Sequence, residues 1–125
     1  MTPAEIGSAG EKIAALYLEK KGYHILRQNY RIKGGEIDII AENAEIIAFV
    51  EVKTRSADFI SDGFEAVTKT KQKLIIKAAA EYFYRFGSDK QPRFDVVSIV
   101  LDGKKVVGFN YITDAFDATG TNIIF

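Results

Sequence analysis

Two apolar runs joined by a link of only four residues limit most sharply what this chain can fold into. The runs are EIDIIA at 36–41 and IIAFVEVK at 46–53, and the link is ENAE. Short runs rich in isoleucine and valine predict strands, and so short a link predicts an antiparallel hairpin. Both faces of the second run are apolar over its first half, which predicts a central strand that is covered on both sides.

Charged side chains interrupt both runs. Asp38 lies between two isoleucines, and Glu51 and Lys53 come at the end of the second strand. Side chains alternate along a strand, so Glu51 and Lys53 share one face of the sheet. If the hairpin sets residues 38 and 51 opposite each other, two carboxylates and a lysine converge where uncompensated burial is costly.

Paired carboxylates of this kind favour a cation. They repel each other, and one of them takes up a proton unless a cation joins them. Mg²⁺ prefers oxygen ligands and is often held by one or two carboxylates plus substrate phosphate, so we expect Mg²⁺ or Mn²⁺. Such an ion polarises a phosphoryl oxygen and activates a bound water, which Lys53 could orient. The open alternative is a salt bridge between Glu51 and Lys53 at a wet sheet edge, because short motifs recur by chance.

Helix signals flank this hairpin. Thr2 before Pro3 predicts a helix start, and Gly22 and Gly87 are natural helix ends. The first predicted helix carries an apolar stripe that includes Leu16. The remaining segments are, in order, a helix over 3–21, a strand over 23–32, a Ser-, Asp- and Gly-rich loop over 56–63, a helix over 68–86, and a hairpin of 93–101 with 105–112.

The order of these segments is helix, three strands, helix, two strands. It predicts one α/β domain (mixed α+β) over residues 1–125, with helices packed on a single mixed sheet. The 47% apolar fraction suits a globular protein.

Charge is balanced overall but unevenly distributed. With 17 basic and 17 acidic residues the net charge is zero, which counts against a protein that coats DNA without specificity. Two segments, 20–33 and 66–80, contain cations and no carboxylate. Such runs are commonly solvated surface, yet they would also suit a polyanion held against a metal site. The cations expected to contact nucleic acid are Arg27, Arg31, Lys33, Arg55, Lys69, Lys71 and Lys73.

Composition also bears on location. The chain has no cysteine, which excludes disulfides and thiolate metal sites and suits a reducing cytoplasm. The N-terminal residues show no basic start followed by an apolar core, and no apolar run reaches the roughly 18 residues of a membrane span. We therefore expect a cytoplasmic protein with no membrane partner.

Four segments together resemble the YraN-type family of small bacterial proteins. They are AGEKIAALYLEKKGYHILRQNYR, GEIDIIA, AFVEVKTR and RFDVV, and the resemblance runs from about Gly7 to Val97. That family is similar to the restriction-endonuclease-like superfamily, whose nuclease signature is an aspartate followed by a glutamate or aspartate, any residue and a lysine. It is also similar, more distantly, to archaeal Holliday junction resolvases.

The resemblance implies roles for five residues. Asp38 and Glu51 become metal-binding carboxylates, and Lys53 becomes the catalytic lysine. Glu11 matches a helical acid that often completes such sites, as a metal ligand and catalytic residue. Gln72 matches a polar residue that some members place near the metal, and we group it with the nucleic-acid contacts.

Three functions remain open. The first is a metal-dependent nuclease acting on DNA, with branched or structured DNA among its candidate substrates. The second is a nucleic-acid-binding module that kept the fold and the charges without cleaving. The third is a protein-interaction adaptor in DNA processing. The presence of Glu11, Asp38, Glu51 and Lys53 favours the first, whereas zero net charge favours the third.

Some residues carry separate expectations. Asp95 is expected to be a structural carboxylate paired with Arg93 or Lys53, and Tyr30 is a candidate for base stacking. The terminal Ile123, Ile124 and Phe125 are expected to be docked, on their own domain or on a second copy. Of the two, a homodimer would suit the cutting of two strands.

Overall fold

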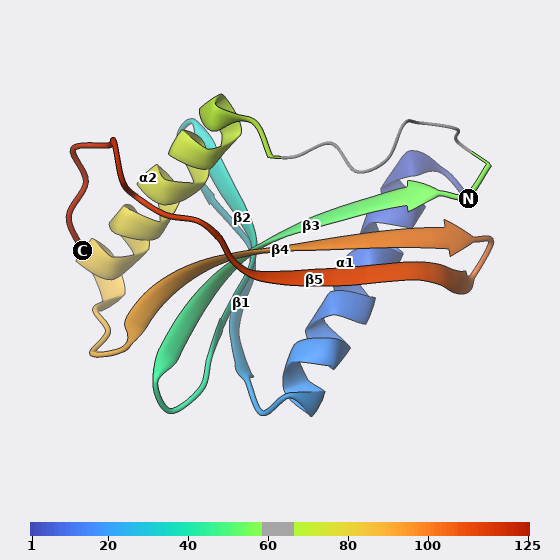
Figure 1. Ribbon diagram of the computed structural model, residues 1–125, viewed down its shortest axis with the longest axis horizontal. Helices are drawn as coiled ribbons and strands as arrows, with labels where there is room; N and C mark the ends of the chain where they lie inside the picture. The colour runs from blue at the N-terminus through green and yellow to red at the C-terminus, as the bar shows by residue number, and fades with distance from the viewer. Residues whose placement is uncertain (59–66) are drawn as a thin grey trace.

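The computed structural model describes residues 1–58 and 67–125. Its elements follow the predicted order of helix, three strands, helix and two strands, so the predicted mixed α/β fold is confirmed (Figure 1). The predicted loop at 56–63 lies outside the described residues from position 59 onward. The elements are α1 (Pro3–Lys20), β1 (His24–Ile32), β2 (Gly35–Glu42), β3 (Ile46–Ser56), α2 (Lys69–Phe86), β4 (Gln91–Asp102) and β5 (Lys105–Phe116).

The five strands form one mixed sheet in the order β1-β2-β3-β4-β5. The pairs β1/β2, β2/β3 and β4/β5 are antiparallel, whereas β3 and β4 are parallel. A parallel pair needs a long crossover connection, and α2 lies in the connection between β3 and β4. β3 is therefore the central strand, as its apolar run predicts.

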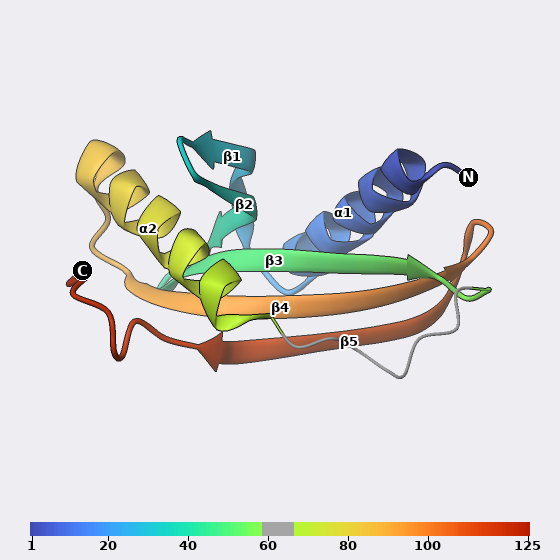
Figure 2. The same cartoon turned by 90° about the horizontal axis from the view of Figure 1, so that it is seen from above.

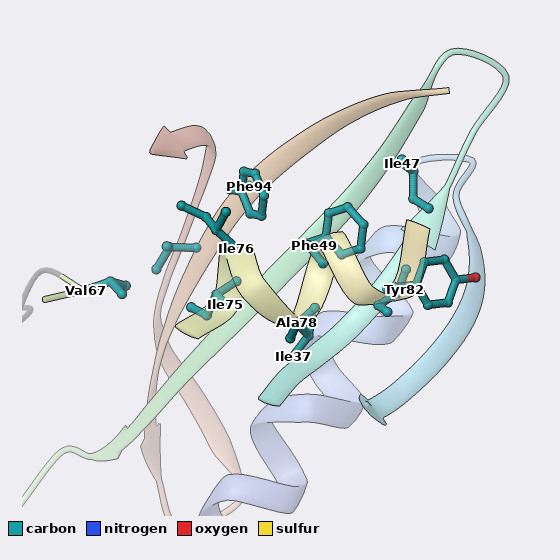
Figure 3. Close-up of a cluster of buried hydrophobic side chains, with 12 residues drawn as sticks. Ile37, Ile47, Phe49, Val67, Ile75, Ile76, Ala78, Tyr82 and Phe94 are labelled. Carbon is teal, nitrogen blue, oxygen red and sulfur yellow. The ribbon is translucent and has the colours of Figure 1, made fainter. Parts of the chain in front are cut away.

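The two helices cover opposite faces of this sheet. Ile47 and Phe49 of β3 belong to the cluster that contains the buried residues of α2 (Figure 3). Ala48 and Val50, which alternate with them, belong to the cluster that contains those of α1. Because successive side chains of a strand point to opposite faces, each helix buries one face of β3.

α1 approaches the sheet closely through small residues. Its buried positions are Gly10, Ala14, Ala15 and Leu18. A Cβ atom added at Gly10 would lie 1.8 Å from Oγ1 of Thr54 in β3, so only glycine allows this contact. Leu16, which the predicted apolar stripe includes, is 59% exposed, and that part of the prediction is wrong. The helix turns its small residues to the sheet because they permit the shorter distance.

The C-terminal residues fold back onto the α2 side of the sheet. The Phe125 ring contacts Phe83 and Phe94, with ring centroids 5.2 and 5.9 Å apart, respectively. Ile123 also packs against this core, whereas Ile124 is 93% exposed. The prediction that this terminus docks is thus correct for two of its three apolar residues. The homodimer stays a prediction.

The pairing of β2 with β3 is short. It joins Ile39 through Glu42 to Ile47 through Val50, and beyond this ladder β2 pairs only with β1, and β3 only with β4. Figure 2 shows β1 and the start of β2 standing away from the layer of β3, β4 and β5. We call the opening between the start of β2 and the end of β3 the strand fork.

Candidate active site

The strand fork brings Asp38 and Glu51 together. The β2/β3 register ends with Ile39 opposite Val50, so the next facing positions along it are 38 and 51. Asp38 stays linked to β3, because its Oδ2 accepts a hydrogen bond of 2.7 Å from the backbone N–H of Val52. The predicted convergence of the two carboxylates thus follows from a ladder that stops one residue before them.

Both carboxyl groups have pKa values above the ordinary range of their residue types. Burial raises the pKa of Asp38 to about 6, repulsion by Glu11 and Glu36 adds to the rise, and the Val52 N–H and Lys71 oppose it. Burial raises the pKa of Glu51 to about 7, and the charge of Asp38 adds to the rise. Two anions that share a half-buried volume repel each other, and a nearby positive charge stabilises them.

Lysines from β3 and α2 supply part of this positive charge. The charge of Lys71, from the first turn of α2, lowers the pKa of both Asp38 and Glu51, and that of Lys53 lowers the pKa of Glu51. Lys53 follows Glu51 on the same face of β3, as strand alternation predicts. Lys71 is held in place by the helix cap, where its N–H donates to Oγ1 of Thr68 at 3.1 Å.

Glu11 reaches the site from the other side. Its neighbour Gly10 rests against Thr54 of β3, which brings α1 to the end of that strand. Burial raises the pKa of Glu11, with repulsion from Glu36 adding, and its Oε1 is buried without a hydrogen-bond partner among the described residues. The charge of Glu11 acts in turn on Asp38. A buried, unsatisfied carboxylate oxygen fits a site that a cation completes.

The donor set suits a hard divalent cation. Asp38 and Glu51 offer carboxylate oxygens, the ligands that Mg²⁺ and Mn²⁺ prefer, and their raised pKa values reflect their burial and the repulsion from neighbouring carboxylates. Within residues 1–58 and 67–125 no three acidic or imidazole groups are close enough to hold a metal ion jointly. Glu11 would therefore act beside a two-carboxylate site, with water and substrate supplying the other ligands.

Sequence reasoning missed two residues close to the site, Glu36 and Asn29. Glu36 raises the pKa of Glu11, Asp38 and Glu51, which places its charge close to all three. Asn29 lies in β1 between the paired residues Gln28 and Tyr30, has a backbone φ of 52°, and lowers the pKa of Glu11. Asparagine tolerates this left-handed conformation better than most residues, and an Asn in a strand-like run was the available clue.

Most of the residues expected to contact nucleic acid lie near the β1–β2 turn or the start of α2, whereas Arg27 does not. Arg31 and Lys71 line an open pocket between the β1–β2 hairpin and α2, and Lys33 is exposed in the turn after β1. Lys69 and Lys73 are exposed on the first turns of α2, and Arg55 lies further along β3. Gln72 donates from Nε2 to the carbonyl of Val67 at 2.9 Å. Arg27 lies elsewhere: its guanidinium stacks on Phe86, 4.9 Å from the ring centroid, at the other end of α2.

Tyr30 and Asp95 both lie in packed surroundings within the fold. Tyr30 packs edge-on against Tyr82, with ring centroids 5.5 Å apart, inside the α2 cluster. Its ring packs against the core, and base stacking by Tyr30 stays a prediction. Asp95 is fully buried and pairs with Arg93 at 2.7 Å, and it also accepts from the Tyr111 hydroxyl at 2.6 Å. It is the structural carboxylate that was predicted, with Arg93 as its partner.

The element order, the mixed sheet and the fork that gathers the carboxylates together agree with the restriction-endonuclease-like fold. The sequence model of the uncharacterised protein family UPF0102 matches residues 10–99. The chain belongs to this family, and the predicted YraN-type membership is confirmed.

Relatives match over nearly their whole length. A UPF0102 protein of Chlorobium phaeobacteroides is 44% identical over 122 residues, covering 93% of this chain and 96% of the relative. One of Caldicellulosiruptor bescii is 48% identical over 120 residues, covering 93% of this chain and all of the relative. One of Caldanaerobacter subterraneus is 46% identical over 114 residues, covering 89% and 93%.

Proposed function

We propose that the protein is a metal-dependent nuclease that hydrolyses phosphodiester bonds in DNA. The observation that carries the proposal is the pair Asp38 and Glu51, which face each other across the strand fork with raised pKa values and Lys53 two residues on. Burial raises these pKa values more than the nearby lysines lower them, so a bound cation would stabilise both carboxylates.

In this proposal Asp38 and Glu51 hold Mg²⁺ or Mn²⁺. The ion, when bound, supplies Lewis-acid activation of the phosphoryl oxygen and of a water. Asp38 is kept in orientation by the Val52 N–H, and Glu11 provides a further oxygen acceptor beside it. Lys53 neutralises charge that develops on the phosphate or orients the attacking water.

The reaction is a displacement at phosphorus. The water oxygen forms a bond to phosphorus, the bond to one ester oxygen breaks, and that oxygen takes up a proton. One phosphate monoester and one hydroxyl result. Lys71, on α2, lies on the side of the site where the cations of that helix would contact the DNA backbone.

A non-catalytic nucleic-acid-binding module is the second candidate. The observation that favours it is that three metal-ligating groups do not converge among the described residues. A protein-interaction adaptor in DNA processing would use the same fold without the charges.

We also propose a cytoplasmic location, on the basis of the missing cysteines. Among the described residues, no helix is long and apolar enough to cross a membrane.

The deciding experiment combines two measurements on wild-type protein. The first is a nuclease screen with Mn²⁺ over linear, nicked, flapped and four-way DNA, with matched RNA substrates. The second is a thermal melt across a Mn²⁺ titration, because an ion that binds only the folded state raises the melting temperature by mass action. Cleavage together with a metal-dependent rise supports the nuclease. A rise without cleavage, or neither effect, contradicts it.

A further inference from the structure

An open pocket of about 300 Å³ lies between the β1–β2 hairpin and the first turns of α2. One wall comes from the β1–β2 hairpin and carries Arg31 and Glu36, and the other comes from α2 and carries Lys71. Glu36 and Lys71 also act on the pKa values of Asp38 and Glu51, so the pocket and the carboxylate site share these two residues.

The pocket combines positive charge with apolar surface. Arg31 and Lys71 provide two cations from different elements. Ile32 and Leu74, which is 37% exposed, provide aliphatic side chains in the lining of the same pocket. A nucleotide unit has the complementary chemistry, since its phosphate is anionic and its sugar is largely apolar along one face.

The two walls are held at a fixed separation. A Cβ added at Gly35 would lie 2.8 Å from the backbone oxygen of Leu74, so the start of β2 and α2 are already in close contact. Lys71 in turn is fixed at its backbone by the Thr68 cap. Preorganised walls of this kind lower the cost of ordering a ligand between them.

Arg31 is only weakly engaged in the free protein. Its Nε lies 3.5 Å from Oε1 of Glu36, and its side chain is 73% exposed. An exposed ion pair of this length contributes little to stability. A phosphate with two anionic oxygens is a better partner for a guanidinium than this single carboxylate contact.

We propose that this pocket binds one nucleotide of the substrate strand, adjacent to the phosphate that reacts. Its phosphate lies between Arg31 and Lys71, its sugar contacts Ile32 and Leu74, and it displaces Glu36 from Arg31. The proposal rests on the proposed function, because the ligand is the nucleic-acid strand that the site would cleave. Glu36 then weakens binding, since its charge competes with the phosphate for Arg31 and repels it.

The test is a binding measurement that does not depend on turnover. Fluorescence anisotropy with fluorescein-labelled single-stranded, duplex and four-way DNA is recorded in Ca²⁺, an oxygen-seeking ion that occupies carboxylate sites. Arg31→Ala and Lys71→Ala should each weaken binding about tenfold, and each should reduce the slope of log Kd against log salt by about one. Glu36→Gln should tighten binding about threefold, because it removes a negative charge beside the phosphate.

The chain offers a matched control. Arg85 and Glu81 also form an exposed arginine–glutamate pair at 3.5 Å, near the far end of α2 and outside the pocket. Arg85→Ala and Glu81→Gln should leave binding within about twofold of wild type. The double variant Arg31→Ala/Glu36→Gln should remain weaker than wild type, because the phosphate contact is lost even when the repulsion is removed.

The outcomes separate this proposal from the proposed function. If Glu36→Gln acts like Glu81→Gln, or Arg31→Ala like Arg85→Ala, the pocket proposal is overturned. A wild type that binds DNA with this pattern but cleaves nothing contradicts the nuclease and upholds the pocket. A wild type that binds none of the probes overturns both.

Discussion

At the scale of single residues, the arrangement around Asp38 and Glu51 disfavours the charges that both groups would carry in water. Both are half-buried, they face each other, and Glu11 and Glu36 add repulsion. The nearby lysines reduce the pKa shifts without abolishing them. The folded protein therefore binds protons at these groups more tightly than the unfolded chain does.

The free energy of unfolding should consequently fall as the pH rises above the ordinary pKa values of these carboxyl groups. The pKa of Glu51 is about 7 in the folded protein and 4.5 in its ordinary state, so the loss accumulates between about pH 4.5 and pH 7. Glu51→Gln removes the charge and should raise the melting temperature at about pH 8, corresponding to on the order of 2 kcal/mol, with little change below about pH 4.5. Thermal melts across pH measure this, with the exposed Glu19→Gln as the control. A pH-independent difference would contradict the assignment.

If Glu51 and Lys53 form a metal site, substitutions of the two residues should have different effects. Glu51→Ala should lose both cleavage and the rise in melting temperature with Mn²⁺, because a ligand is gone. Lys53→Ala should keep or tighten Mn²⁺ binding, since a positive charge has left a group of carboxylates, while cleavage falls about a hundredfold or more. Melts of both variants across a Mn²⁺ titration, beside a nuclease assay, test this. Equal destabilisation of both with no metal response would favour a salt-bridge cluster instead.

How far single residues were predictable depends on what determines their position. Asp38 and Glu51 stand out because a charge within an apolar run is expensive, and that signal is local. Glu36 gives no such signal, because it is the first residue of the run and has no apolar residue before it. For Tyr30, the position beside Arg31 is visible in the sequence, whereas the contact with Tyr82 depends on the packing of α2.

At the scale of elements, α1 carries Glu11 to the site only because Gly10 lets the helix lie against β3. Gly10→Ala places a methyl group on Thr54, so we expect a loss of about 1–3 kcal/mol in the free energy of unfolding from overpacking. Gly7→Ala is the control, since no atom lies within 4 Å of its added Cβ. That change should be neutral or stabilise by up to about 1 kcal/mol through helix propensity. Chemical denaturation of both variants measures the difference.

A loss confined to Gly10→Ala would be the expected result. In that variant α1 should also shift relative to β3, which would weaken the influence of Glu11 on Asp38 and reduce the Mn²⁺-dependent rise in melting temperature. Similar stabilities for the two variants would show that the helix approaches the sheet less closely than described.

The elements themselves were largely predictable, but their relations were predictable only in part. Periodicity and glycine punctuation predict both helices and all five strands, and the four-residue link predicts the β2/β3 hairpin. The sequence does not predict how far β2 and β3 pair. The start of β2 pairs with β1, away from the layer of β3, β4 and β5, and so does not pair with β3. The rotation of α1 was also misjudged at Leu16, since an apolar stripe does not reveal how closely small residues will pack.

At the scale of the whole molecule, the C-terminus closes the core on the α2 side. Phe125 contacts Phe83 and Phe94, whereas the adjacent Ile124 is 93% exposed. Phe125→Ala should reduce the free energy of unfolding by about 1 kcal/mol through lost burial and ring contacts, and Ile124→Ala should change it by less than about 0.5 kcal/mol. Chemical denaturation compares the two variants. Equal effects would contradict the docking of Phe125.

Light scattering on the same variants addresses the predicted homodimer. If Ile124 is the residue that a second copy covers, Ile124→Ala should shift the molecular mass toward the monomer while leaving stability at low concentration unchanged. No sequence pattern distinguished these neighbouring residues, because both are apolar and terminal. Their difference follows from the direction of the chain after Thr121, whose hydroxyl bonds the carbonyl of Ala118.

The parallel pairing of β3 with β4 has a consequence for how the molecule assembles. The Asp38–Val52 hydrogen bond spans only 14 residues, so the two carboxylates can meet as soon as one hairpin forms. β4 can join β3 only after the long crossover containing α2 has closed, and contacts between distant parts of a chain form slowly. Lys71 arrives with that crossover. We therefore expect the two mutually repelling carboxylates to come together first during folding, and Lys71, which acts on both, to join them late.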